Sequence, residues 1–378
     1  MSVLAVVRWP VGGIKTYIRY VYGHTVFKRF KVTLLSPDYG MKDYLEGFLS
    51  DSELRYINTG SSMFSMVFST LKELRSDYYK LVHSHGFTAA LVIAPVCKAY
   101  RKPHLITAHD VFLASQFNGW RGAIKYLAMR WVLENSDRIH AVSVDGKENI
   151  RQFFPSIREE KIDVVLHGID VETFSNASPA QLEFGPRQDR GDRFVFGFLG
   201  RFMAQKGFRV LVEAVNLIVK KDRANRSFCV ATFGWGGFIR EDYEYIEELG
   251  LGKYFCQLPE TNDVASAIKA LDAVVMPSRW EACGLLGMEV LTAGRPLIAS
   301  RCIGLREVIQ DTPALSFEVD DVEELAECMV NCMHNESVQK ELAKNYVDEA
   351  KVRFCHENAA KGLLDIYNSM LNMHALIN

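Results

Sequence analysis

Short apolar runs alternate with longer stretches of helical period along most of the chain. The apolar runs have the length of strands, and the stretches between them repeat their apolar positions every three or four residues, as amphipathic helices do. An alternation of strands and helices is typical of parallel sheets covered by helices. The sequence therefore predicts an α/β protein. The expected strands are Val3–Arg8, Lys31–Ser36, Leu81–His83, His104–Thr107, Asp137–Ser143, Ile162–Leu166, Phe194–Leu199, Phe228–Thr232, Tyr254–Gln257, Ala273–Met276 and Leu297–Ser300.

A segment without hydrophobic period, Ser175–Arg193, separates two series of these units. It contains Pro179, Gly185, Pro186 and Gly191, which is typical of a linker. At 378 residues the chain is long enough for two domains of ordinary size. We therefore expect domains at residues 1–174 and 175–352, with a helical segment at 353–378.

The composition is that of a globular protein without a disulfide framework. The chain is 48% hydrophobic and 24% charged, with a net charge of −2. Its eight cysteines form no C-x-x-C pair, and no histidine is spaced from them as a zinc site requires, which favours free thiols in a reducing compartment. The first apolar run is too short for a signal peptide, and no run approaches the roughly 20 residues of a membrane span. We expect a cytoplasmic protein.

Charge is unevenly distributed between the two halves. Residues 1–168 carry 22 Lys and Arg against 15 Asp and Glu, whereas the remainder carries 22 against 31. A basic half indicates an anionic partner such as phosphate groups or a membrane surface, although solvated surface charge would give the same imbalance. Binding to nucleic acid is not expected, because the second half is acidic and no basic-aromatic module is present.

One expected helix combines aromatic and basic side chains. Packing of this helix on the sheet is the first interpretation of its apolar stripe. The alternative is a peripheral contact of its basic edge with the inner face of a membrane. The stripe consists of Phe117, Trp120, Ile124, Leu127 and Trp131, flanked by Arg121, Lys125 and Arg130.

The stretch from Pro277 to Pro296 carries the clearest chemistry. It follows a buried strand and contains Glu281 and Glu289, eight residues apart, with Cys283, Gly284 and Leu285 between them. If a helix begins near Cys283, the amides of its first turn face the gap between the two carboxylates, where the helix dipole favours an anion. Two carboxylates beside an anion site suit a ligand with hydroxyls and phosphates, such as a sugar nucleotide. Two solvated surface carboxylates are the alternative.

Further polar residues stand where expected strands end, and ligands bind at that edge of open α/β sheets. Gly200-Arg201, with Lys206-Gly207 after it, supplies two cations that suit a pyrophosphate. The first strand runs into Gly12-Gly13, whose backbone a ligand can approach, and Lys15 would suit a phosphate or an acidic acceptor. His85 and His109 follow two other strands. A turn and structural hydrogen bonds are the alternatives for these glycines and histidines.

The motifs together resemble those of the retaining GT-B glycosyltransferases of family 4. The pair Glu281 and Glu289, with Gly294 and Pro296 beyond, is similar to the donor-site signature of that family, and the G-R-x4-K-G segment at 200–207 is similar to its phosphate-binding pair. Thr107-Ala108-His109-Asp110 resembles its T-x-H-D/G segment, and His167-Gly168-Ile169-Asp170 resembles its N-G-I/V-D segment with His in place of Asn.

This resemblance implies two Rossmann-like, doubly wound domains facing across a cleft, with the last helices crossing back to the first domain. It implies a donor linked to UDP or GDP, whose leaving phosphates meet Arg201 and Lys206 and whose sugar meets Glu281. His109 would contact the sugar or its phosphate. The donor would also contact Gly13, Gly200, Pro259, Glu260, Cys283, Gly284, Leu285 and Glu289, the last through the ribose; Gly12, Lys15 and His85 would lie on the acceptor side.

The function implied is transfer of a sugar, with retained configuration, to a carbohydrate or lipid-linked glycan in cell-surface polysaccharide or glycolipid synthesis. No D-x-D stands at a strand end, so neither a metal nor a cofactor is expected. Three alternatives remain. They are a GT-B sugar-nucleotide epimerase, a phosphorylase (for which no pyridoxal lysine is evident) and a sugar-nucleotide-binding protein without catalysis.

Overall fold

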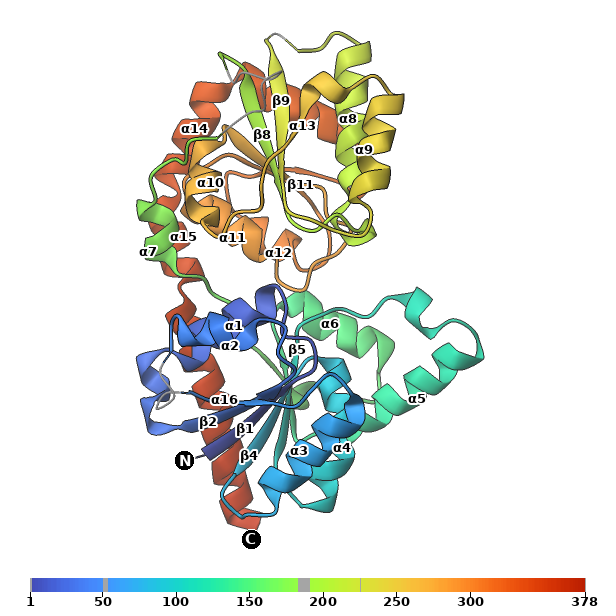
Figure 1. The fold of residues 1–378 in the computed structure, drawn as a ribbon, viewed down its shortest axis with the longest axis vertical. Coiled ribbons are helices and arrows are strands. Elements are labelled where there is room, and N and C mark those ends of the chain that lie inside the picture. The colour runs from blue at the N-terminus through green and yellow to red at the C-terminus, as the bar shows by residue number, and fades with distance from the viewer. Residues whose placement is uncertain (1, 50–53, 183–190, 225, 378) are drawn as a thin grey trace. The chain divides into compact units, whose positions relative to one another are not determined.

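The chain folds into two compact units in a computed structural model that describes residues 2–49, 54–182, 191–224 and 226–377 (Figure 1). The first unit is Met1–Gly168 together with His356–Asn378, and the second is Ile169–Cys355. Part of the predicted linker, residues 183–190 with Gly185 and Pro186, lies outside the described residues.

The first unit is built on a parallel sheet. Its strand order among the described residues is β3-β2-β1-β4-β5-β6-β7, and each neighbouring pair runs in the same direction. The strands are β1 Ser2–Val7, β2 Lys31–Ser36, β3 Leu54–Asn58, β4 Leu81–His85, β5 His104–Ala108, β6 Arg138–Ala141 and β7 Ile162–Val164.

The second unit has a parallel sheet of the same kind. Its order in the described part of the chain is β10-β9-β8-β11-β12-β13. The strands are β8 Phe194–Leu199, β9 Phe228–Phe233, β10 Phe255–Gln257, β11 Ala273–Met276, β12 Leu297–Ser300 and β13 Leu315–Phe317. In both sheets the order reverses beside the first strand, as in doubly wound folds.

Helices connect the strands. In the first unit they are α1 Gly13–Tyr22, α2 Met41–Glu46, α3 Met63–Leu74, α4 Phe87–Ala99, α5 Gly119–Asn135, α6 Val144–Phe153 and α16 His356–Ile377, with short helices η1 Thr25–Arg29, η2 Ala114–Phe117 and η3 Glu159–Lys161. In the second they are α7 Val171–Asn176, α8 Phe208–Lys220, α9 Ile239–Glu248, α10 Val264–Ala270, α11 Leu285–Thr292, α12 Arg306–Ile309, α13 Val322–His334, α14 Glu336–Asn345 and α15 Val347–Phe354, with η4 Ala204–Lys206 and η5 Gly252–Tyr254.

Both faces of the first sheet are covered because β1 is apolar from Val3 to Val7. Val3, Ala5 and Val7 pack with side chains of α1 and α16, whereas Leu4 and Val6 pack on the other face with α3 and α4. Alternate residues of a strand point to opposite faces, so a continuous apolar run requires helices on both sides. The C-terminal helix α16 is part of this core through Leu363 and Tyr367.

The predicted α/β class with two parallel sheets is confirmed, but two strands were missed. The edge strand β3 is half polar, and the edge strand β13 has three residues, so neither gives a clear apolar run. The predicted limit of the first domain after residue 174 is also wrong. Helix α7 belongs to the second unit, where it packs against α11 and α15. The tail that joins the first unit begins at His356 rather than at residue 353.

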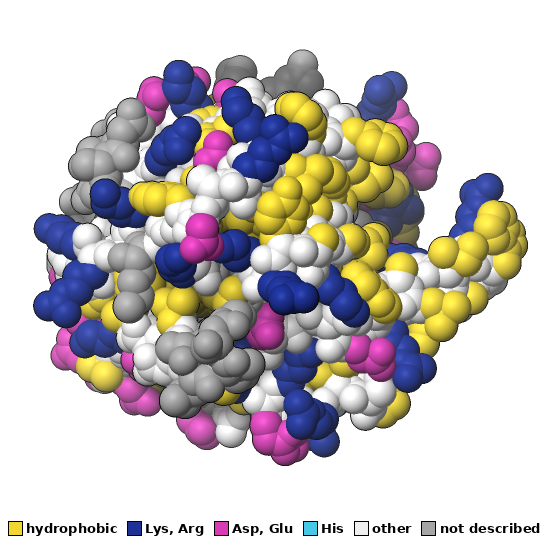
Figure 2. Space-filling model, turned by 90° about the horizontal axis from the view of Figure 1, so that it is seen from below, with side chains coloured by type: hydrophobic (Ala, Val, Ile, Leu, Met, Phe, Trp, Pro, Cys, Tyr) yellow, Lys and Arg dark blue, Asp and Glu magenta, His cyan; other side chains and the backbone are white. Residues whose placement is uncertain are grey.

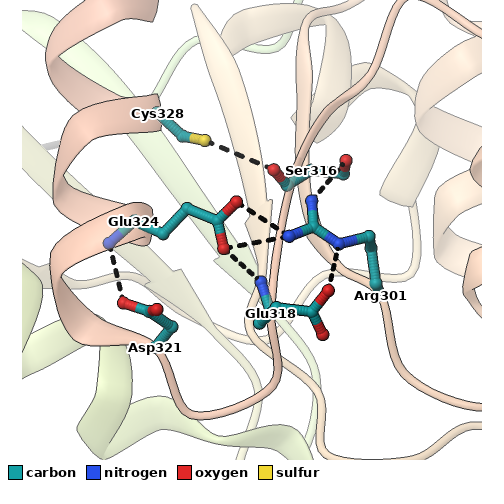
Figure 3. Close-up of polar contacts among 6 residues, drawn as sticks. All are labelled: Arg301, Ser316, Glu318, Asp321, Glu324 and Cys328. Atoms are coloured by element: carbon teal, nitrogen blue, oxygen red, sulfur yellow. Dashed lines mark hydrogen bonds and ion pairs between the residues drawn. The ribbon is translucent and has the colours of Figure 1, made fainter.

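The loop after β12 is held in place by Arg301 (Figure 3). Its guanidinium donates to Oε1 of Glu318 at 2.7 Å and to both carboxylate oxygens of Glu324 at 2.8 and 3.0 Å. Glu324 lies in the first turn of α13, where Asp321 caps the helix by accepting from the backbone N–H of Glu324. These bonds join the end of β12 to the residue after β13 and to the first turn of α13, and they hold the start of the loop that follows β12 in position.

Candidate functional site

The first component of the site is the start of α11. The helix begins at Leu285, two residues later than the predicted start near Cys283, because Gly284 precedes it in the left-handed conformation, with φ 57°. A Cβ at Gly284 would lie 2.8 Å from Cδ1 of Leu305. Cys283 is buried. Glu289 therefore lies in the second turn of α11, and Glu281 lies in the preceding loop, as predicted.

The second component is an ion pair between two loops. Nζ of Lys206, at the end of η4, lies 2.6 Å from Oε1 of Glu281, and the Ser278 hydroxyl donates to the same oxygen at 2.7 Å. Glu281 is buried, and its backbone N–H donates to the carbonyl of Ile303 at 3.0 Å. Lys206 and Glu281, predicted as separate ligand contacts, are therefore partners of each other.

The two loops meet because Gly207 has no side chain. A Cβ there would lie 1.9 Å from the carbonyl oxygen of Pro277, and the backbone φ of 63° is one that L side chains rarely adopt. Gln205 adds two hydrogen bonds between the loops. Its side-chain amide donates to the carbonyl of Trp280 at 2.9 Å, and its backbone carbonyl accepts from the backbone N–H of Arg279 at 2.7 Å.

Glu289 differs from Glu281 in its contacts. In the part of the chain that the structure describes, its carboxylate makes neither a hydrogen bond nor an ion pair. Burial raises the pKa of Glu289 to about 7, and the positive charge of Lys206 opposes this shift. A half-buried carboxylate that accepts from no donor among the described residues is poised to accept hydrogen bonds from a ligand.

Arg201 is the second predicted cation. It follows Gly200, whose φ is 145°, at the carboxyl end of β8. The side chain is exposed and pairs with no residue in the described ranges. The predicted cation pair is thus divided into Lys206, held by a carboxylate, and Arg201, which remains available to an external anion.

Pro259 and Glu260 lie farther along the same sheet edge. Both are exposed and follow β10, the edge strand, which β9 and β8 separate from β11. Between them and Arg201 lies Trp235, an exposed residue that was not among the predicted ligand contacts. Its carbonyl accepts from the N–H of Phe202 at 3.0 Å. The signal was the G-W-G-G run directly after β9, because an aromatic residue in a glycine-rich loop at this edge is suited to ligand contact.

The predicted acceptor-side residues lie in the first unit. Gly12 precedes α1 with φ 58° and open space around its Cα, and Gly13 is the first residue of that helix. Lys15 is not free: its ammonium donates to the carbonyls of Tyr39 at 2.8 Å and Gly40 at 3.1 Å. Burial lowers the pKa of Lys15, opposed by the charge of Asp38.

His85 and His109 contact each other directly. His85 is the last residue of β4 rather than a loop residue, and His109 follows β5. Nδ1 of His85 lies 3.0 Å from Nε2 of His109, and Nδ1 of His109 lies 3.2 Å from Nε2 of His167. Burial, reinforced by neighbouring imidazoles, holds the pKa of His85 and His109 well below the usual value. Both rings are therefore neutral near pH 7, and both ring nitrogens of His109 are engaged.

Among the described residues, no group of three or more His, Cys, Asp or Glu is arranged to hold a metal ion. No helix in the same residues is long and apolar enough to cross a membrane.

Two families of known proteins match the chain, one for each half. Residues 11–173 match the family described as Glycosyltransferase Family 4, and residues 193–335 match the one described as Glycosyl transferases group 1. The second match contains Arg201, Lys206, Glu281 and Glu289, and the first contains His85 and His109.

Individual relatives are distant but extend over nearly the whole chain. The D-inositol 3-phosphate glycosyltransferase of Corynebacterium kroppenstedtii is 26% identical over 95% of this chain and 86% of its own length. The Escherichia coli UDP-Gal:alpha-D-GlcNAc-diphosphoundecaprenol alpha-1,3-galactosyltransferase is 23% identical over 91% of this chain and 90% of its own length. Among solved structures, Anabaena Alr3699/HepE in complex with UDP-glucose has a TM-score of 0.81 at 17% identity, covering 98% of this chain and 100% of that one. That likeness extends to the fold of both sheets.

Proposed function

Since the chain belongs to the family 4, group 1 glycosyltransferases of GT-B type, we propose that it transfers a hexose from a nucleoside diphosphate to a hydroxyl group, with retention of configuration. The observation that carries this proposal is the arrangement around α11. A buried carboxylate paired with Lys206 stands around the carboxyl ends of β8 and β11, together with Glu289 and Arg201, whose side chains have no partner among the described residues.

Each residue has a role that follows from its charge. The guanidinium of Arg201 donates to the phosphate oxygens in planar geometry, and the ammonium of Lys206 adds a second positive charge. As the bond between sugar and phosphate breaks, negative charge develops on the leaving diphosphate. Cations and first-turn amides of α11 fixed before the reaction stabilise that charge without reorganisation. On this proposal the cationic side chains, rather than a metal ion, neutralise the leaving group.

The two carboxylates hold the sugars of the donor. Glu281 keeps one oxygen on Lys206 and Ser278 and accepts from a hydroxyl of the transferred sugar with the other. Glu289 accepts from the ribose hydroxyls. His109 contacts the transferred sugar. These are the roles that the family resemblance implies for the corresponding positions.

UDP is the proposed nucleotide. A similar solved structure contains UDP-glucose, and one relative is named for a UDP-galactose donor. The same relative is named for a diphosphoundecaprenol acceptor, which favours a lipid-linked glycan as the acceptor of this chain and a role in cell-surface polysaccharide or glycolipid synthesis.

Helix α5 supports a contact with the membrane that would carry such an acceptor. Its inner side packs in the core through Met129, Val132 and Leu133. On its outer side Trp120 is 70% and Leu127 is 62% exposed. Phe117, predicted as part of this stripe, instead lies in η2 and packs against the core.

Basic residues flank the exposed stripe. Arg121, Lys125 and Arg130 are exposed, and Figure 2 shows apolar and basic side chains side by side on the arm that η2 and α5 form at the right. Apolar side chains bordered by cations fit a surface of anionic lipid. We propose that this side of α5 contacts the inner face of the membrane peripherally.

Incubation of the full chain with UDP-glucose, UDP-galactose and GDP-mannose, with and without polyprenyl-diphosphate glycans, tests the function. The proposal predicts release of one nucleoside diphosphate that increases when an acceptor is added, and an axial linkage in the product by NMR. An inverted linkage would contradict retention. Interconversion of a nucleotide sugar without an acceptor would indicate an epimerase, and binding without turnover would indicate a non-catalytic protein.

A further inference from the structure

Five histidines lie on, or just after, neighbouring strands of the first sheet. His83 and His85 lie on β4, His109 follows β5, His140 lies on β6 and His167 follows β7, and these four strands are adjacent in the sheet. All five rings are bonded into one network that also contains Thr107, Tyr22 of α1 and Tyr367 of α16. The proposed glycosyl transfer uses only His109 of this network.

Burial keeps these rings neutral. It holds the pKa of His83, His85 and His109 well below the usual value and lowers that of His140 to about 4 and that of His167 to about 3. A neutral imidazole has one N–H donor and one acceptor nitrogen. In a chain of such rings, the position of one proton therefore determines the position of the next.

The hydrogen bond at one end of the network determines which atom donates in each of the bonds that follow. Nε2 of His140 lies 2.8 Å from the carbonyl oxygen of Val165, which can only accept, so the proton of His140 is on Nε2. Nδ1 of His140 then accepts from the hydroxyl of Thr107 at 3.0 Å. The oxygen of Thr107 accepts in turn from Nε2 of His83 at 2.6 Å, which leaves Nδ1 of His83 as an acceptor.

Two tyrosines continue the network. The hydroxyl of Tyr367 lies 2.7 Å from Nδ1 of His83, closer than that of Tyr22 at 3.0 Å, so Tyr367 is the donor to His83. The hydroxyl of Tyr22 donates to the oxygen of Tyr367 at 3.0 Å. The oxygen of Tyr22 is then free to accept from Nε2 of His85 at 2.8 Å.

The hydrogen bonds among His85, His109 and His167 can run in the same donor-to-acceptor direction. If the proton of His85 is on Nε2, its Nδ1 accepts from Nε2 of His109, and Nδ1 of His109 accepts from Nε2 of His167. The opposite direction would put a proton on Nδ1 of His167, a buried atom with no hydrogen-bond partner among the described residues. A buried donor without an acceptor is costly, whereas an unused acceptor nitrogen costs less.

We propose that His167, His109, His85, Tyr22, Tyr367, His83, Thr107 and His140 form one head-to-tail hydrogen-bond chain ending on the carbonyl of Val165, and that His85 and His167 are positioning residues that fix the tautomer of His109. In this arrangement each of the eight bonds has its own donor and acceptor. All five histidines carry their proton on Nε2.

The consequence concerns what His109 can bind, and this step rests on the proposed function. The N–H of His109 points inward to His85, and its remaining nitrogen, Nδ1, is an acceptor. A substrate group that replaces His167 at this nitrogen must therefore donate a proton. The hydrogen-bond chain therefore favours a sugar hydroxyl at Nδ1 of His109 over a phosphate oxygen, which can only accept.

NMR of the full-length chain labelled with ¹⁵N-histidine tests the tautomers directly, independently of any transferase activity. At pH 7 the proposal predicts a protonated Nε2 and an unprotonated Nδ1 for each of the five histidines. A proton on Nδ1 of His85, His109 or His167 would overturn it. Absence of sugar transfer would count against the proposed function but would leave this result unaffected.

The variant Tyr22→Phe tests whether the rings act as one unit. It removes the acceptor of His85 while keeping the ring, so the signals of His85, His109 and His167 should change together, and His140 should keep its proton on Nε2. Ser84→Ala is the matched control, since Ser84 is buried on the strand that carries His85 and its hydroxyl bonds, within the described residues, to His104 alone, which is not part of the proposed hydrogen-bond chain. Unchanged outer rings in Tyr22→Phe, or equal changes in Ser84→Ala, would contradict the proposal.

Conservative replacement separates positioning from packing. In His167→Gln the amide nitrogen takes the place of Nε2 and can still donate to Nδ1 of His109, whereas His167→Leu cannot. We expect turnover to fall by about tenfold or more in His167→Leu and to recover most of that loss in His167→Gln. Equal turnover in the two variants would contradict a positioning role for His167.

Discussion

The ammonium of Lys206 and the carboxylate of Glu281 lie 2.6 Å apart, although 75 residues separate them in the sequence. The pair joins the loop after β8 to the loop before α11, and those loops carry the residues proposed to bind the donor. A ligand in this site meets a carboxylate whose charge is already balanced. The pair therefore acts both as part of the site and as part of its support.

Removal of Lys206 should destabilise the protein as well as inactivate it. Lys206→Met leaves the buried Glu281 without its cation, which we expect to cost about 3 kcal/mol of unfolding free energy, the lower end of the range for a broken buried pair. The double variant Lys206→Met with Glu281→Gln should recover part of that loss. Urea denaturation of the unaltered chain, Lys206→Met, Glu281→Gln and the double variant measures the interaction energy between the two side chains. Additive effects would mean that the pair contributes no interaction energy.

Arg201 should affect activity without affecting stability, because its side chain is exposed and unpaired among the described residues. Arg201→Ala should lower kcat by about 10²- to 10³-fold, as loss of one donor to a developing anion does elsewhere. Its melting temperature should not change. The control is Arg223→Ala, an arginine paired with Glu323 beyond the C-terminal end of α8. A similar loss of turnover in both variants would argue against a specific role for Arg201.

Glu289 should make both donor binding and stability depend on pH. Its pKa of about 7 in the folded protein lies above the unfolded value of 4.5, so the folded state holds the proton more tightly. This contribution to stability is therefore present at low pH and is lost as pH rises from about 4.5 to about 7. Acceptance of ribose hydroxyls instead requires the ionised form, so donor affinity should rise through the upper part of that window. Glu289→Gln should flatten both profiles, measured by calorimetry and thermal unfolding.

The contact at Gly207 predicts a large effect from a single methyl group. Gly207→Ala would put a Cβ 1.9 Å from the carbonyl of Pro277, so the two loops must separate, and we expect a loss of about 2 kcal/mol or more. Gly12→Ala is the matched control, since Gly12 also has positive φ but has open space. Its loss should be about 1 kcal/mol. Equal melting temperatures for the two variants would mean that the loops are not in contact.

Exposed residues of α5 should determine binding to lipid. Trp120→Ser with Leu127→Ser should abolish flotation with vesicles of anionic lipid, and salt should weaken the binding of the unaltered chain, because Arg121, Lys125 and Arg130 border the stripe. Val338→Ser changes another exposed apolar residue, 54% exposed on α14, and should have no effect. Binding that persists after the α5 substitutions would place the contact elsewhere.

The apolar pattern was sufficient to predict the long central strands, because a strand buried on both faces must be apolar throughout. It was not sufficient for β3 and β13, since edge strands bury less of their surface and need fewer apolar residues. The start of α11 was predicted two residues early. A glycine with positive φ before a helix is indistinguishable in sequence from one within its first turn.

The candidate site was predicted residue by residue but not pair by pair. The sequence indicated Arg201, Lys206, Glu281 and Glu289 as ligand contacts, and their roles remain predictions. It did not indicate that Lys206 bonds to Glu281 or that His167 bonds to His109. These contacts depend on the order of strands in a sheet and on the path of loops, which hydrophobic period does not specify.

The proposed function depends on a nucleoside diphosphate that binds beside the start of α11. A crystal structure of the chain with UDP would show whether it does. We expect phosphate oxygens within hydrogen-bond distance of the Arg201 guanidinium and the Lys206 ammonium, and ribose hydroxyls on Glu289. UDP bound with its phosphates away from both cations, or with its ribose away from Glu289, would disprove the proposed donor site.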